Sequence, residues 1–115
     1  MSEDGVMKTR PLVYVAGPYT HPEPVENTHR AIKVADELIE LGYSVFVPHL
    51  TLLWHIVSPK PADFWYAYDF SILARCDILY RLRGYSKGAD AEVAMAEGMG
   101  IPVFYEYDPQ NDRLL

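Results

Sequence analysis

The sequence contains one cysteine, Cys76, so no disulfide can form within the chain. No apolar run approaches the roughly 20 residues needed to span a bilayer. The polar segment Met1 to Arg10 has no signal-peptide core. These absences predict a cytoplasmic protein with no membrane partner, in which Cys76 is a small buried side chain.

Positive charge is also scarce, with ten basic against sixteen acidic residues and a formal net charge of −6. No basic stripe is present, so we expect no nucleic acid polymer as a partner. The sequence has no G-x-S-x-G elbow, P-loop or G-x-G-x-x-G motif. The spacing of the four histidines does not suit a metal, and we expect no metal and no cofactor. They are His21, His29, His49 and His55.

Half of the residues are hydrophobic, which is typical of a packed core. The length of 115 residues predicts a single domain over residues 1–115, with a core at about 11–106 and a polar tail at each end. An anionic small ligand remains compatible with the acidic composition, because backbone N–H groups bind phosphate whatever the net charge.

Short apolar runs alternate with helical patterns along the chain. We expect strands at 12–16, 44–47, 77–81 and 102–105, and helices at 25–41, 62–75 and 89–99. Residues 49–61 are predicted to form a loop with room for one helical turn. Alternating strands and helices predict an α/β fold with a parallel sheet, and the nearly all-apolar strands predict helices on both faces.

Ligands of such sheets bind at the carboxyl ends of the strands. Those ends are Gly17 to Thr20, Pro48 to Leu50 and Gly84 to Gly88. All three segments contain turn or polar residues, which predicts that they form one pocket.

Glu92 is the most informative position of the last predicted helix. At about 100° per residue, it lies about 140° from Glu97 and about 160° from Asp90, both on the polar face. A carboxylate on the apolar side of a helix is costly unless it is used or satisfied. One interpretation is a Glu at the edge of the buried face whose head reaches water. The other is a functional carboxylate, which its place near the ligand end of the sheet favours.

Asp69 is the second isolated carboxylate. Its helical neighbours are apolar or aromatic, namely Trp65, Tyr66, Ile72 and Leu73. It is a surface Asp between large side chains, an Asp bonded to a nearby Tyr, or a functional group. Together with Glu92 it suggests acid/base and nucleophile roles at a glycosidic carbon.

Two segments are candidates for binding phosphate. Ser86 suits the N-cap of the last helix, and the same geometry of N–H groups, hydroxyl and positive helix end suits an anion. The second segment is Gly17-Pro18-Tyr19-Thr20. His49 follows the second strand and lies either in the pocket or on the surface, while Tyr14 in the first strand is more typical of core.

Four segments taken together resemble the nucleoside 2-deoxyribosyltransferase-like superfamily, which includes nucleoside deoxyribosyltransferases and nucleoside 5′-monophosphate N-glycosidases. They are V-Y-V-A-G-P-Y, the P-H after the second strand, D-F-S-I-L-A-R-C-D, and S-K-G-A-D-A-E-V-A-M-A-E-G-M-G-I-P-V. The resemblance covers about residues 12–105. It implies a three-layer flavodoxin/Rossmann-like fold with a parallel sheet of four to five strands.

The resemblance also implies roles for particular residues. Glu92, six residues after Ser86, matches the family's nucleophile, while Asp69 and Tyr14 match its helical aspartate and first-strand tyrosine. Ser86 stands where the monophosphate branch has its phosphate-binding serine. Further ligand contacts are implied for the loop residues Gly17, Tyr19, His49 and Gly88. The chain departs from the family at Pro18, which lacks an N–H donor, and in having no basic residue in that loop.

The implied activity is cleavage of the N-glycosidic bond of a (deoxy)nucleoside or its 5′-monophosphate through a covalent glycosyl-Glu intermediate. Water would complete a hydrolysis and a second base a transfer. We expect the helix N-terminus to keep Glu92 ionised. The resemblance also implies a homodimer that uses the aromatic helix at 62–75. Two alternatives remain, a nucleotide-binding or sensing module without turnover and a glycohydrolase of NAD-like dinucleotides.

Overall fold

The protein is described from a computed structural model that places residues 9–110. The predicted polar tails lie largely outside the described residues. The elements in chain order are β1 (Leu12–Ala16), α1 (Pro24–Glu40), β2 (Ser44–Phe46), the 3-10 turn η1 (Pro48–Leu50), α2 (Thr51–Val57), α3 (Ala62–Leu73), β3 (Ile78–Arg81), α4 (Lys87–Gly98) and β4 (Val103–Tyr105).

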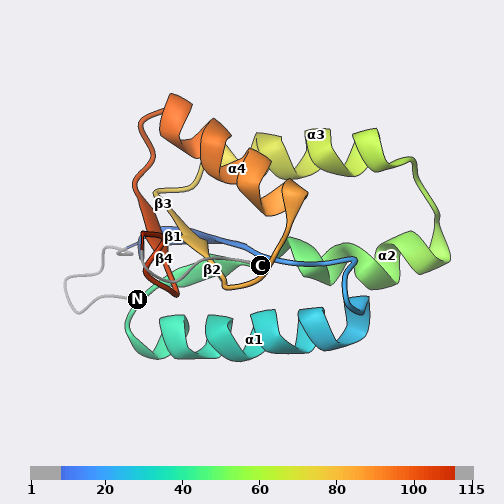
Figure 1. The fold of residues 1–115 in the computed structure, drawn as a ribbon, viewed down its shortest axis with the longest axis horizontal. Coiled ribbons are helices and arrows are strands. Elements are labelled where there is room, and N and C mark those ends of the chain that lie inside the picture. Colours follow the sequence, from blue (N-terminus) through green and yellow to red (C-terminus); the bar gives the residue numbers. More distant parts are fainter. Residues whose placement is uncertain (1–8, 111–115) are drawn as a thin grey trace.

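The four strands form one parallel sheet in the order β2-β1-β3-β4. Helix α1 lies on one side of this sheet, while α3 and α4 lie on the other (Figure 1). The predicted three-layer α/β fold is therefore confirmed, with four strands. Parallel neighbours place the carboxyl ends of β1 and β3 at one edge, as the sequence predicted.

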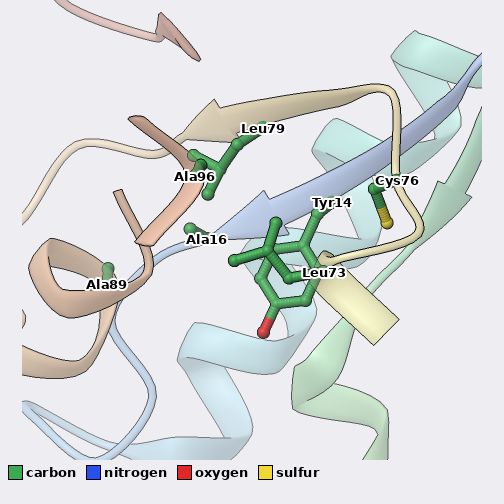
Figure 2. Packing of buried hydrophobic residues seen from close by; sticks show 7 residues of the cluster. All are labelled: Tyr14, Ala16, Leu73, Cys76, Leu79, Ala89 and Ala96. Atoms are coloured by element: carbon green, nitrogen blue, oxygen red, sulfur yellow. The ribbon is translucent and has the colours of Figure 1, made fainter. Parts of the chain in front are cut away.

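Alternate residues of β1 serve the two faces of the sheet. Val15 packs into a cluster with Ala31 and Val34 of α1. Tyr14 points the other way and packs with Leu73 of α3 and Ala96 of α4. Figure 2 shows the Tyr14 ring beside Leu73, with its hydroxyl oxygen at the edge of the apolar cluster. The strand thus supplies a purely apolar side chain to one face and a polar tip to the other.

Helix α2 is the main departure from the predicted elements. Thr51–Val57 forms two turns of α-helix where the sequence predicted a loop with one helical turn at most. Its apolar residues Leu53, Ile56 and Val57 are exposed, so they follow no buried helical stripe. At seven residues the helix is too short for periodicity to identify it, and its N-terminus lacks a side-chain cap as well.

Cys76 is buried, as predicted. Among residues 9–110, no group of three or more His, Cys, Asp or Glu side chains could hold a metal ion. None of the helices placed in this range is long and apolar enough to cross a membrane.

Candidate functional site

A cleft of about 670 Å³ opens at the carboxyl ends of β1 and β3. The segment 17–21 after β1 forms one part of its lining, and residues 85–89 at the start of α4 form another. Side chains of α2 and α3 complete the wall. All predicted site residues except Tyr14 line this cleft.

Glu92 and Tyr14 are joined at the base of the cleft. The Tyr14 hydroxyl donates a hydrogen bond of 2.5 Å to Oε2 of Glu92. Glu92 is 8% exposed, and Tyr14 is fully buried behind it. Burial, followed by the nearby Glu92 charge, raises the pKa of Tyr14, so this hydroxyl stays protonated and remains a donor. The Glu92 carboxylate is therefore turned inward and fixed by a neutral donor.

Burial raises the pKa of Glu92 to about 8, although the Tyr14 hydrogen bond opposes the shift. The expectation that the helix N-terminus keeps Glu92 ionised at neutral pH is therefore wrong. Ser86 is the N-cap of α4, so Glu92 lies in the second turn. The influence of a helix dipole on charge falls off within the first turn, and here desolvation outweighs it.

Asp69 faces the same space from α3 and lines the cleft. Its Oδ1 is enclosed and accepts no hydrogen bond from the residues described. Burial raises its pKa to about 7, and its charge raises the pKa of Glu92 in turn. Because two coupled carboxyl groups disfavour double ionisation, the pair retains about one proton near neutral pH.

Ser86 forms the N-cap predicted from the sequence, because its hydroxyl accepts the Ala89 N–H at 3.0 Å. The N–H groups of Lys87 and Gly88 are the first two of the helix, which have no partner within an α-helix. A Cβ at Gly88 would lie 3.8 Å from Tyr66 of α3, across the cleft. The start of α4 thus presents N–H donors, a hydroxyl and open space to the cleft.

The loop after β1 is held in place by contacts with Leu82 and His49. A Cβ at Gly17 would lie 2.9 Å from the Leu82 side chain, so the close packing requires glycine there. His49 Nε2 lies 2.8 Å from the Pro18 carbonyl oxygen, to which it donates. Its Nδ1 is enclosed without a partner among the described residues. This placement favours a structural role for His49, in holding the loop, rather than the ligand contact that the sequence predicted. Tyr19 packs its ring edge-on against His49 and also lines the cleft.

Arg81 is a buried charge whose importance the sequence analysis missed. It ends β3 with no exposed surface, and it donates to the Leu82 carbonyl at 2.6 Å and to Oδ1 of Asp90 at 2.9 Å. Its charge also lowers the pKa of Glu92, although less than burial raises it. A lone cation at the end of an apolar strand, nine residues before an aspartate, was the available signal.

His55 is a second residue that the sequence analysis left without a role. It lies on α2 and lines the cleft. Its Nδ1 accepts the indole N–H of Trp65 at 2.9 Å and the backbone N–H of Lys60 at 3.3 Å. The pattern of residues cannot predict this contact, because it joins α3, which the sequence predicts, to α2, which the sequence does not predict.

The fold places the chain in a class of α/β proteins with a cleft at the carboxyl end of a parallel sheet, here lined by the buried Glu92 and the half-buried Asp69. The chain belongs to the family described as Domain of unknown function (DUF4406), whose model matches residues 11–105. A comparison with curated proteins finds no match.

Solved structures share the fold. One similar structure is a 2-deoxyribosyltransferase from the psychrotolerant bacterium Bacillus psychrosaccharolyticus, with a TM-score of 0.63 and 19% identity over 90% of this chain and 77% of that one. Another is a 2-deoxyribosyltransferase from Leishmania mexicana, with a TM-score of 0.63 and 16% identity over 83% of this chain. The match spans 63% of the Leishmania protein's length. At these identities the likeness establishes the fold.

Proposed function

We propose that the protein cleaves the N-glycosidic bond of a nucleoside or nucleoside 5′-monophosphate, with Glu92 as the nucleophile. The observation that carries this proposal is the Glu92 carboxyl group itself, buried beside the cleft, bonded to Tyr14 and electrostatically coupled to Asp69. The 2-deoxyribosyltransferase fold of the two structural neighbours supports it. Glycosidic cleavage by double displacement uses one carboxyl group as the acid and the other as the nucleophile.

With about one proton on the pair, the reactive arrangement has that proton on Asp69 and the charge on Glu92. The pKa of Glu92, about 8, lies above that of Asp69, about 7, so a single proton favours Glu92 and the reactive arrangement is the less populated one. Tyr14 binds Oε2, which leaves Oε1 as the attacking oxygen. Tyr14 and Arg81 both favour the ionised form of Glu92. We therefore assign Tyr14 the role of orienting and stabilising the nucleophile.

The reaction proceeds in two displacements. Glu92 Oε1 bonds to C1′ as the C1′–N bond breaks, and the base leaves with the proton from Asp69. An incoming water then attacks C1′, returns a proton to Asp69 and releases Glu92. Hydrolysis results when water is the acceptor. A second base as the acceptor would give transfer, the reaction class that the names of the two structural neighbours indicate.

We place the 5′-phosphate, where the substrate has one, at the start of α4. The free N–H groups of Lys87 and Gly88 and the Ser86 hydroxyl converge there. The adjoining loop contributes Gly17 and Tyr19 to the same part of the cleft. Pro18 offers no N–H, so the α4 end supplies most of the donors.

The test is to incubate the protein with ribo- and deoxynucleosides, their 5′-monophosphates and NAD, and to measure free base by chromatography. Glu92→Gln is expected to lower base release at least about 1,000-fold. Its matched control is Glu97→Gln, which alters an exposed carboxylate of the same helix and leaves the rate unchanged. Tight nucleotide binding without base release from any substrate would instead identify a binding module, and release from NAD alone a dinucleotide glycohydrolase.

The roles of the two carboxyl groups can be separated by a second pair of variants. Asp69→Asn should slow release of poor leaving groups more than that of activated ones, because only poor ones need the proton. Asp63→Asn is the control, since Asp63 is exposed on the same helix. Mass spectrometry with a slowly hydrolysed 2′-fluoro nucleoside should find a sugar attached to Glu92. Labelling elsewhere, or in Glu92→Gln, would reject the covalent intermediate.

We also propose that two copies associate through α2 and the aromatic helix α3. Exposed large apolar side chains gather on these helices, and such a patch is typical of an interface. They are Leu53, Trp54, Ile56, Val57, Phe64 and Tyr66. Sedimentation should give the mass of a dimer, and Val57→Glu should give a monomer. A monomer in the unmodified chain would reject this assembly.

A further inference from the structure

The cleft extends beyond the carboxyl pair along one face of α3. Asp69, Trp65 and Ala62 all line it and are spaced by four and three residues, which places them on the same side of a helix. At a rise of 1.5 Å per residue, Trp65 lies about 6 Å from Asp69 along the axis. A planar ring whose leaving nitrogen lies near Asp69 would therefore extend toward Trp65.

The wall beside Trp65 presents one fixed donor, the His55 ring. His55 Nδ1 accepts both the Trp65 indole N–H and the Lys60 backbone N–H. A ring nitrogen that accepts hydrogen bonds holds no proton of its own, so the proton of the neutral ring is on Nε2. No residue within 9–110 accepts a hydrogen bond from this Nε2–H. His55 lines the cleft and is thus held with Nε2–H as its donor.

The other polar groups of this wall differ in what they offer. Lys60 also lines the cleft, and its ammonium group carries donors alone. Thr51, one turn before His55 on α2, donates its hydroxyl proton to the Pro48 carbonyl at 3.0 Å, so it retains an acceptor. Of the two groups on α2, only His55 contacts Trp65, the residue on the α3 line that leads away from Asp69.

We propose that the tautomer of His55, fixed by Trp65, selects nucleosides whose base carries a carbonyl oxygen on the edge opposite the sugar. Uracil, thymine, hypoxanthine and guanine have an acceptor there, whereas cytosine and adenine present an amino group. A donor facing a donor leaves both N–H groups without a partner, which costs more than a missing contact alone. The selection rests on the proposed function, since it concerns the base that Glu92 releases.

Binding is measured by calorimetry in the Glu92→Gln chain, which avoids turnover. Uridine 5′-monophosphate is expected to bind about 10- to 100-fold more tightly than cytidine 5′-monophosphate. Inosine 5′-monophosphate should bind more tightly than adenosine 5′-monophosphate by a similar factor. Trp65→Phe keeps an aromatic face but removes the shorter of the two hydrogen bonds to His55 Nδ1, leaving only the 3.3 Å bond from Lys60, so the ratio should fall. Trp54→Phe is the matched control, because Trp54 packs on Trp65 without bonding to His55, and should preserve the ratio.

The tautomer has a readout that needs neither ligand nor activity. The ¹⁵N spectrum of labelled protein should show Nδ1 of His55 unprotonated and Nε2 protonated, with the signals assigned by their loss in His55→Gln. Protonated Nδ1 in the neutral ring would overturn the inference. So would equal binding of uridine and cytidine nucleotides, or a preference for amino bases that Thr51→Val abolishes. Base release without selectivity would refute this inference alone, whereas absence of nucleotide binding and release would refute the proposed function as well.

Discussion

The two faces of the sheet are built from the same strands but do different work. The face under α1 is covered by small and branched apolar side chains, with Val15, Ala31 and Val34 at its centre. The face under α3 and α4 mixes apolar packing with the Tyr14 hydroxyl, Glu92 and Arg81, all buried. The first face serves only to stabilise the fold. The second face is less stabilising, because burying polar groups away from water costs free energy.

Tyr14→Phe should produce the largest difference between the faces. The variant keeps the ring in its apolar cluster but removes the donor to Glu92. Because that hydrogen bond lowers the pKa of Glu92, its loss raises the pKa further and leaves less ionised nucleophile at a given pH. We expect base release to fall about 100-fold at pH 7 and by a smaller factor at pH 8.5. A pH–rate profile measures this, and an equal loss at both pH values would separate Tyr14 from the ionisation of Glu92.

Val15→Ala is the matching change on the other face, one residue along β1. Val15 is fully buried, so the truncation leaves a small cavity against α1. We expect a loss of about 1–3 kcal/mol in the free energy of unfolding, measured by urea denaturation. The pH–rate profile should keep its shape. A shifted profile would mean that the two faces are coupled through the strand.

The contrast between the faces was partly readable in the sequence. Short apolar runs alternating with helical patterns, and the position of Glu92 on the apolar side of α4, predicted the parallel sheet, the inward carboxylate and its place near the loops. Two features that complete the site were not readable. Helix α2 has no buried stripe, and the bond between His55 and Trp65 joins two helices whose spatial relation no local pattern contains. The dipole expectation for Glu92 was wrong because sequence distance from the cap says nothing of desolvation.

The stability of the protein should depend on pH through the second face. Glu92 and Asp69 have raised pKa values, about 8 and about 7, so the folded chain holds protons that the unfolded chain has already released above about pH 4–5. Stability from these groups is therefore full at acid pH and is lost as pH rises through 7 to 8. Glu92→Gln removes the part of this loss of stability at alkaline pH that comes from ionisation of Glu92.

The variant should accordingly gain about 1 kcal/mol or more relative to the unmodified chain at pH 8.5, and gain little at pH 5. Urea denaturation at the two pH values measures the difference. Glu97→Gln, on the exposed side of α4, should show no such pH dependence. If the gain were the same at pH 5, burial of the charge would not be its cause.

Gly88→Ala should have the smallest effect on stability. Within the second face, it tests whether a position affects ligand binding without affecting the packing of the fold. Its Cβ would meet Tyr66 at 3.8 Å and Ser86 Oγ at 3.9 Å, which are ordinary contacts, and its φ is not in the left-handed region. By contrast, a Cβ at Gly84 would lie 2.7 Å from Pro18 at a φ of +123°. We expect Gly88→Ala to change the free energy of unfolding by less than about 0.5 kcal/mol, and Gly84→Ala to cost about 1–3 kcal/mol.

The added methyl group of Gly88→Ala would nevertheless project into the cleft at the end where we place the phosphate. Nucleoside 5′-monophosphates should therefore lose more affinity than the corresponding nucleosides, as calorimetry can measure. Equal losses for both would place the phosphate elsewhere. Because we expect the fold of this variant to be unperturbed, such a result would reject only the proposed phosphate position. The role of Glu92 would still stand, because its test depends on the bond to C1′ alone.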